Sequence, residues 1–135
     1  MAKLREEQKI DLVRIASEVR KWAYVPYSKY SVGAAVLTES GRIYDGVNIE
    51  NAAFPVTVCA ERTAIFKAVS NGEQKFQAIA VVTKDGGMPC GSCRQVMAEF
   101  SPHMLVIVAD ESGRITAEKE LAELLPGMFN AESLE

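Results

Sequence analysis

Val58-Cys59-Ala60-Glu61-Arg62 and Pro89-Cys90-Gly91-Ser92-Cys93 contain all three cysteines of the chain, and we expect the fold to be organised around these two stretches. Each lies where helical periodicity begins. A helix N-terminus offers free N–H groups and the positive end of the helix dipole, which stabilise a thiolate. If the two helices lie side by side on one face of a sheet, the three thiolates meet at one end of it. We therefore interpret the stretches as two halves of one metal site.

Outward from these stretches, hydrophobic periodicity predicts alternating helices and strands. Helices are expected over residues 5–23, 58–70, 91–100 and 118–125, and strands over 31–38, 42–47, 76–83, 104–109 and 114–117. The first two strands are separated by Glu39-Ser40-Gly41, which predicts a hairpin. Helices that alternate with continuous apolar strands imply a sheet covered on both faces. We expect an α/β fold with three α/β/α layers and a mixed sheet of about five strands.

Length and composition predict one domain over residues 1–135. A hydrophobic content of 48% with 24% charged residues is typical of soluble globular proteins. The net charge of −3 argues against a nucleic-acid partner, which favours a basic face. The charged start of the chain does not resemble a secretory signal, and the longest apolar run, residues 104–109, is too short to span a bilayer. We expect a cytoplasmic protein with no membrane partner, whose cysteines serve metal or redox chemistry.

Three cysteine ligands suit zinc, which prefers four ligands in a tetrahedron. Cys59, Cys90 and Cys93 would leave the fourth position open, as in catalytic zinc sites. Glu61 follows the first ligand by two residues, so its carboxylate is held within the first helical turn and can transfer protons. The Arg62 guanidinium can donate to the cysteine sulfurs and offset the net negative charge of three thiolates on one Zn²⁺.

Other interpretations of these residues exist. A C-x-x-C pair by itself is often a structural knuckle or a redox pair, and His103 as a fourth ligand would close the site. We consider the closed site a minor alternative, because structural zinc sites usually complete both ligand pairs locally. Glu61 alone favours the helix dipole, and Arg62 alone is typical of a surface. The combination favours a catalytic site.

Asn48-Ile49-Glu50 is a candidate sugar-binding segment. Side chains at positions i and i+2 of an extended segment point the same way, and an amide with a carboxylate can bind sugar hydroxyls. Alternatively, the segment is a solvated connecting loop. Of the tyrosines in residues 24–30, whose simplest role is packing, only Tyr30 is kept as a site candidate.

These motifs resemble the zinc signature of the cytidine deaminases, whose three-cysteine variant uses a glutamate as acid and base. The resemblance extends over residues 24–35, 48–52, 63–70 and 123–127, and is closest to the short, homotetrameric enzymes that act on free nucleosides. It implies that the three cysteines hold one Zn²⁺ per subunit, that Glu61 is the proton shuttle, and that sites are completed by neighbouring subunits.

The resemblance also implies substrate contacts. Asn48 and Glu50, with Ile49 between them, hold the ribose, and the backbone around Ala60 contacts the pyrimidine. The remaining implied positions are Tyr30, where the family usually has phenylalanine near the substrate ring, Phe54, where tyrosine is common, and Phe129, an aromatic that reaches into a neighbouring site. Phe54 would lose any hydroxyl contact. The loop over residues 84–88 is shorter than in the family.

The predicted activity is zinc-dependent hydrolytic deamination of cytidine and 2′-deoxycytidine to uridine and 2′-deoxyuridine, with release of ammonia, in pyrimidine salvage. Three rivals remain. They are a deaminase of another small molecule such as a nucleoside antibiotic, a nucleic-acid deaminase, which the acidic charge balance disfavours, and a zinc-stabilised binding module without catalysis.

Overall fold

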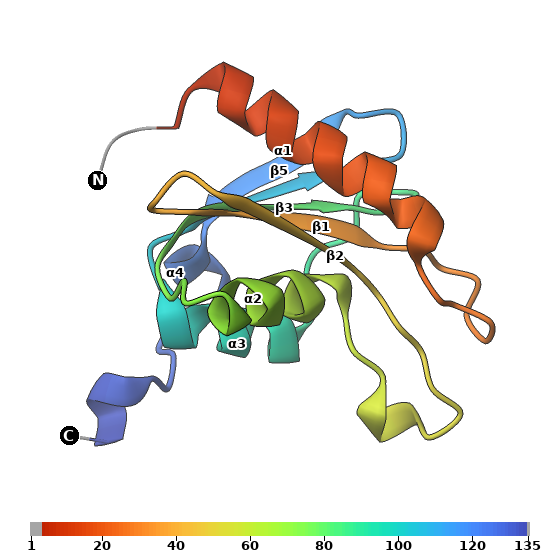
Figure 1. Ribbon diagram of the computed structural model, residues 1–135. Coiled ribbons are helices and arrows are strands. Elements are labelled where there is room, and N and C mark those ends of the chain that lie inside the picture. Colours follow the sequence, from red (N-terminus) through yellow and green to blue (C-terminus); the bar gives the residue numbers. More distant parts are fainter. Residues whose placement is uncertain (1–3, 135) are drawn as a thin grey trace.

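The computed structural model describes residues 4–134, and five strands within them form one mixed sheet (Figure 1). The strand order is β2-β1-β3-β4-β5, with bounds β1 Gly33–Thr38, β2 Ile43–Val47, β3 Phe76–Val82, β4 Leu105–Ala109 and β5 Ile115–Glu120. Strands β3 and β4 are parallel, and the other neighbouring pairs are antiparallel. The predicted mixed sheet is confirmed.

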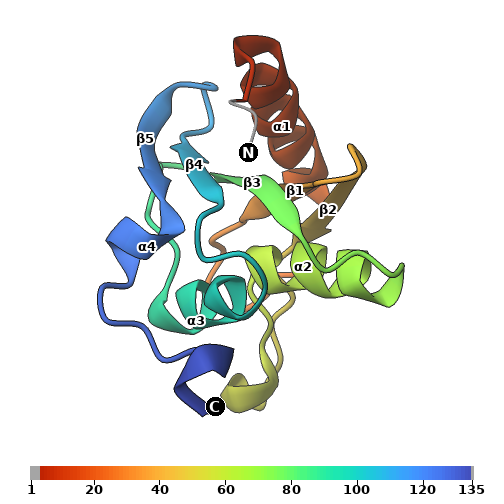
Figure 2. The ribbon, with the colours of Figure 1, turned by 90° about the vertical axis from the view of Figure 1, so that its left-hand side faces the viewer.

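Helices cover both faces of the sheet, as predicted (Figures 1 and 2). Helix α1 (Glu6–Val19) covers one face, while α2 (Ala60–Ser70), α3 (Gly91–Phe100) and the short α4 (Leu121–Leu124) lie on the other. Three 3₁₀ turns complete the described chain, at Arg20–Trp22, Phe54–Val56 and Ala131–Leu134. Because α2 and α3 lie side by side below the sheet in Figure 2, their N-termini can share one site.

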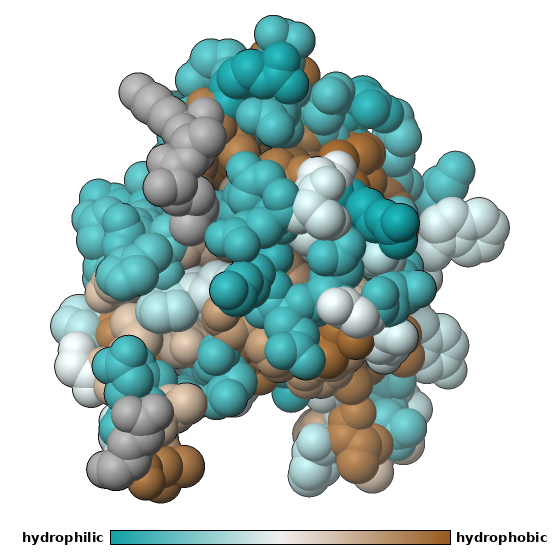
Figure 3. All heavy atoms as spheres, turned by 60° about the vertical axis from the view of Figure 1, so that its left-hand side comes forward, coloured by the Kyte–Doolittle hydropathy of each residue, from teal (hydrophilic) through white to brown (hydrophobic). Residues whose placement is uncertain are grey.

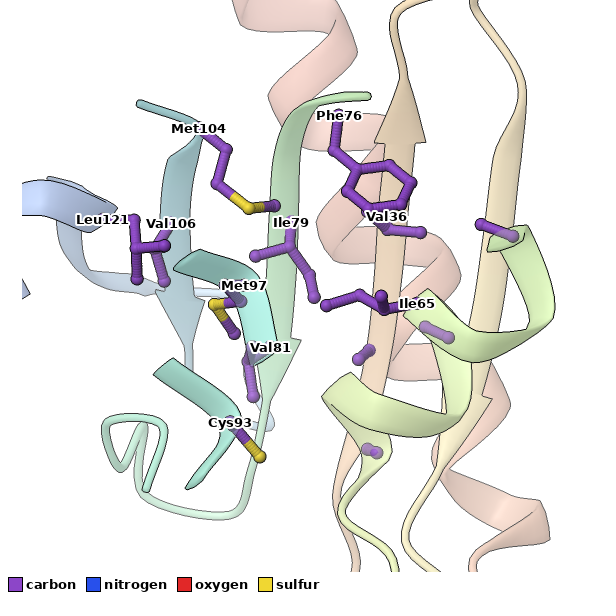
Figure 4. Packing of buried hydrophobic residues seen from close by; sticks show 14 of the residues in the cluster. Val36, Ile65, Phe76, Ile79, Val81, Cys93, Met97, Met104, Val106 and Leu121 are labelled. Carbon is purple, nitrogen blue, oxygen red and sulfur yellow. The ribbon is translucent and has the colours of Figure 1, made fainter. Parts of the chain in front are cut away.

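The core between the sheet and α2/α3 fixes where these helices begin (Figure 4). Ile65 of α2, Met97 of α3 and Ile79 of β3 are fully buried in one cluster. Cys93 lies at the end of that cluster, one helical turn before Met97, and is also fully buried. Burial of this helix face therefore holds one cysteine toward the sheet while α3 begins beside it.

Helix α2 lies unusually close to β2. An added Cβ at Gly46 of β2 would lie 2.4 Å from the backbone nitrogen of Ala64 in α2. The buried face of α2 is rich in alanine, with Ala60, Ala64 and Ala68 fully buried. Small residues on both sides thus allow the helix that follows Cys59 to pack directly on the sheet.

Two predicted boundaries near the C-terminus were wrong. The strand predicted over residues 114–117 extends to Glu120, and the helix predicted over 118–125 shrinks to Leu121–Leu124. Residues 118–120 pair with β4 down to Leu105↔Glu120, so ladder hydrogen bonds outweigh their helical pattern. Glu120 then opens α4 in a capping box with Glu123.

The face of the molecule shown in Figure 3 is mostly polar, with apolar atoms concentrated on two projections at its lower edge. In Figure 1 these projections are the loop after β2 and the C-terminal segment. Their most exposed large apolar side chains are Phe54, Val56, Phe129 and Leu134. None of the helices in residues 4–134 has the length and apolar character that crossing a membrane requires.

Candidate metal and catalytic centre

The three cysteines converge at the N-termini of α2 and α3. Cys59 and Cys90 are the N-cap residues of the two helices, and Cys93 lies in the first turn of α3. The Sγ of Cys90 lies 3.8 Å from that of Cys59 and 3.5 Å from that of Cys93, and all three Sγ atoms fall within 4.8 Å of one another. The predicted meeting of the cysteines at one end of the sheet is confirmed.

This geometry fits zinc. Zn–S bonds of about 2.3 Å in a tetrahedron put neighbouring sulfurs about 3.8 Å apart. His103 is not part of the group, because its Nδ1 pairs with Glu120 Oε1 at 2.6 Å and its side chain is exposed. The alternative of a closed site with His103 as the fourth ligand is therefore wrong. Within residues 4–134, three cysteines are the grouped ligands, which leaves a fourth position for water or substrate.

Charges around the sulfurs favour a bound cation. Hydrogen bonding from Cys93, aided by Arg62 and opposed by burial, lowers the pKa of the Cys59 thiol to about 5. The hydrogen bond with Cys59, together with burial, raises the pKa of Cys93. Three crowded sulfurs thus cannot all ionise alone, whereas a divalent cation binds all three as thiolates.

Glu61 lies beside these sulfurs in the first turn of α2 and is 4% exposed. Burial is the main cause that raises the pKa of its carboxyl group, and the charge of Cys59 adds to it. A carboxyl group whose pKa is raised toward neutrality can both accept and donate protons. Its placement next to an open metal position suits proton transfer to a substrate.

A cavity of about 290 Å³ opens beside the cysteines. The predicted site residues that line it are Tyr30, Asn48, Cys59, Ala60, Glu61, Glu50 and Cys90. The structure thus brings the two cysteine stretches, the 48–50 segment and Tyr30 around one space.

Asn48 and Glu50 are both fixed by the segment that precedes β1. Asn48 accepts a hydrogen bond from the Val32 amide at 3.0 Å and donates one to the Tyr30 carbonyl at 2.8 Å. Glu50 accepts from the backbone amides of Tyr27 and Ser28, each at 3.1 Å, and from the Ser28 hydroxyl. These bonds lower the pKa of Glu50, with the Ser28 hydroxyl as the largest cause. The pair is therefore held in place before any ligand binds.

Three predicted substrate residues do not line this cavity. Ile49 is 45% exposed, and its backbone pairs with Tyr24 and Val58. Phe54 is 72% exposed and lines a neighbouring cavity of about 390 Å³. Phe129 is 59% exposed, and its carbonyl accepts a hydrogen bond from Gln95 at 2.6 Å. Their roles stay predictions.

The cavity also has wall residues that were not predicted. Ser28 holds Glu50, and Thr83, at 4% exposed, ends β3 and anchors the turn before Cys90. Asp85 in that turn accepts a hydrogen bond from the Tyr30 hydroxyl. Polar residues directly after a buried strand were a usable signal for Thr83 and Asp85, but nothing in the sequence linked them to Tyr30.

Comparison with known proteins places this geometry in context. A family model described as the cytidine and deoxycytidylate deaminase zinc-binding region matches residues 6–109. A cytidine deaminase from Sporosarcina psychrophila is 52% identical over 126 residues, which cover 91% of this chain and 92% of that protein. At lower identity, a blasticidin-S deaminase from Bacillus cereus is 34% identical over 130 residues, covering 89% and 91% of the two chains.

The solved structures agree with the sequence relatives. The crystal structure of a cytidine deaminase from Burkholderia pseudomallei superposes with a TM-score of 0.85 at 38% identity, and covers 93% of this chain and 100% of the other. The fold and the cysteine group are therefore similar to those of enzymes with one kind of chemistry.

Proposed function

This chain belongs to the family of zinc-binding cytidine and deoxycytidylate deaminases, and we propose that it hydrolyses cytidine and 2′-deoxycytidine to the corresponding uridines and ammonia. Deamination of cytidine is the reaction for which the closely similar relatives are named. The observation that carries the proposal is the convergence of three cysteine sulfurs with the buried Glu61 on one cavity lined by Asn48 and Glu50.

Zinc held by Cys59, Cys90 and Cys93 supplies a Lewis acid that lowers the pKa of a water molecule to about 7. Glu61 accepts a proton from the attacking water and delivers it to ring N3. As the C4–N bond breaks, Glu61 protonates the leaving amino group, so that ammonia departs and a carbonyl remains at C4. The burial and raised pKa of Glu61 support this role.

The remaining predicted residues bind and orient the nucleoside. Asn48 and Glu50 hold the sugar hydroxyls, Ile49 sets the spacing between them, and the backbone at Ala60 contacts the pyrimidine. Their hydrogen bonds to residues 27–32 support a preformed sugar site. Tyr30 packs beside the ring, which its position on the cavity wall supports.

We propose a homotetramer in which Phe54 and Phe129 reach the sites of neighbouring subunits. The exposure of these two aromatic rings, together with Val56, supports an interface, because large exposed apolar groups often mark one. Light scattering should give four times the chain mass, and a mass of one chain would contradict the assembly. We also propose a cytoplasmic enzyme of pyrimidine salvage, for which growth of a pyrimidine-requiring strain on cytidine is the test.

The test of function combines metal analysis with ammonia release. We expect one zinc per chain and release from cytidine and 2′-deoxycytidine, but little from free cytosine or adenosine, which lack either the sugar or the pyrimidine. Blasticidin S belongs in the same assay, because one relative is named for it. Release from blasticidin S alone would replace the proposal with an antibiotic deaminase.

The other two rivals have their own discriminators. A nucleic-acid deaminase would bind a single strand with an affinity that falls steeply with salt. A zinc-stabilised module without catalysis would not bind a hydrated pyrimidine nucleoside, which mimics the transition state, more tightly than cytidine.

A further inference from the structure

The turn between β3 and Cys90 is anchored from two strands. The Thr83 hydroxyl at the end of β3 accepts hydrogen bonds from the amides of Gly86 and Gly87, at 2.8 and 2.9 Å. On the other side, the Thr116 hydroxyl of β5 lies 3.3 Å from the Gly86 carbonyl, to which it donates. Gly86 has a φ of +77°, which favours glycine. The turn therefore has a defined shape, and Met88 and Pro89 lead from it to the ligand Cys90.

A third anchor comes from a distant segment. The Tyr30 hydroxyl donates to Asp85 Oδ1 at 2.6 Å, across 55 positions of sequence. Gly87 lies close by, since an added Cβ there would be 3.3 Å from the Tyr30 hydroxyl. The same residue is tied to the sugar-binding pair, because its carbonyl accepts from Asn48 and its amide donates to the Ser28 hydroxyl. Tyr30 thus joins the turn before Cys90 to the segment that holds Asn48 and Glu50.

The charge of the partner strengthens this contact. The hydrogen bond from Tyr30 is the main cause that lowers the pKa of Asp85, so the carboxylate is ionised at neutral pH. Desolvation, with the Asp85 hydrogen bond next, raises the pKa of Tyr30, so the phenol keeps its proton. A phenol that donates to a carboxylate makes a charge-assisted hydrogen bond, shorter and stronger than a neutral one.

The aromatic ring of Tyr30 does not explain this arrangement. A phenyl ring alone would line the cavity equally well, whereas only the hydroxyl reaches Asp85. The two points at which this chain departs from the cytidine deaminases, tyrosine at position 30 and the short loop over residues 84–88, therefore meet in one hydrogen bond.

We propose that the Tyr30–Asp85 hydrogen bond holds the turn that carries Cys90 against the nucleoside-contacting segment, which makes Tyr30 and Asp85 positioning residues for the metal and for the substrate. The part of this inference that concerns substrate rests on the proposed function. Loss of the bond should loosen the turn, so that zinc escapes faster and the nucleoside binds more weakly, while the chemical step changes less because Glu61 is untouched.

The experiment is a double-mutant cycle on the zinc-loaded protein with Tyr30→Phe, Asp85→Ala and both together. Two quantities are measured, the rate of zinc transfer to an excess of chelator, and KM and kcat for cytidine. Each single variant should release zinc and raise KM by about threefold to tenfold, with kcat within about twofold of the starting protein. The double variant should be no worse than Asp85→Ala alone, because the bond is lost once.

Two further variants serve as controls. Tyr44→Phe removes a phenol that has no hydrogen-bond partner among residues 4–134, and should match the starting protein. Asp85→Asn keeps an acceptor oxygen and should restore most of the zinc retention lost in Asp85→Ala.

Either of two results would overturn the proposal: a Tyr30→Phe variant indistinguishable from Tyr44→Phe in both measurements, or single effects that multiply in the double variant. Zinc release is measured without substrate, so it tests the proposal even if the protein fails to deaminate cytidine. An inactive starting protein would instead count against the proposed function.

Discussion

The Arg62 guanidinium lies with one Nη 3.4 Å from the Sγ of Cys59, to which it donates, while its Nε is buried without a hydrogen-bond partner among residues 4–134. The two residues are three positions apart at the start of α2, so the helix that directs the sulfur also supplies a cation beside it. The contact raises the pKa of Arg62, chiefly through the hydrogen bond to Cys59. A fixed positive charge next to three thiolates offsets the excess negative charge that they place on Zn²⁺.

Arg62→Gln should therefore weaken the centre. We expect loss of a hydrogen bond to a charged group, about 1.5–3 kcal/mol, which corresponds to a roughly tenfold to hundredfold loss in zinc affinity or turnover. Competition with a chelator measures the affinity, and ammonia release measures the turnover. Arg42→Gln is the matched control, because that side chain is exposed at the start of the second hairpin arm. Equal zinc affinity in the two variants would contradict a role for the Arg62 charge.

Asn48→Asp should disturb the sugar site through one atom. The substitution keeps the oxygen that accepts from Val32 but replaces the amide donor by a second oxygen facing the Tyr30 carbonyl. We expect a loss of about 1–3 kcal/mol in the free energy of unfolding, measured with urea, and a higher KM for cytidine. Asn130→Asp is the control, because the interaction found for its side chain uses only the oxygen, at 3.1 Å from the Glu132 amide. Similar losses in both variants would refute this assignment.

The titration of Glu50 should report its contact with Ser28. Hydrogen bonds in the folded protein lower its pKa below 4.5, so their contribution to stability is present above pH 4.5 and is lost as pH falls through the lower folded-state pKa. Ser28→Ala removes the largest cause, and should raise the Glu50 pKa toward 4.5 and increase KM for cytidine. Carbon-13 NMR of the carboxyl group measures this pKa, and an unchanged value in Ser28→Ala would contradict the account.

Gly46→Ala should separate α2 from the sheet. The added Cβ would lie 2.4 Å from Ala64 N and 2.8 Å from Ala60 O, both in the backbone of α2. We expect a destabilisation of about 1–3 kcal/mol from overpacking, with reduced turnover because Cys59 and Glu61 move with the helix. Gly91→Ala is the control for unfolding, since nothing lies within 4 Å of its added Cβ. If Gly46→Ala unfolds at the same urea concentration as the starting protein, the close packing has no energetic role.

Local patterns in the sequence predicted the metal centre and most of the fold. The bounds of α3 match the predicted helix over residues 91–100, and both cysteine stretches lie at helix starts because capping and periodicity are local properties. Residues 118–120 escaped prediction because pairing with β4 decides their structure.

Long-range contacts in the site were also out of reach. Tyr30 and Asp85 are distant in sequence, and neither carries a pattern that specifies the other. Asn48 and Glu50 were predicted as sugar ligands, but their hydrogen bonds to residues 27–32 depend on how the chain enters β1.

The central claim is that Glu61 moves the protons beside a zinc held by three cysteines, and Glu61→Gln tests it most directly. Glutamine keeps the shape of the side chain but cannot accept and donate the proton in turn. The account predicts one zinc per chain in Glu61→Gln with cytidine turnover reduced by about 10²-fold or more, while the exposed Glu99→Gln keeps both zinc and turnover. Near-normal turnover in zinc-loaded Glu61→Gln would contradict the account.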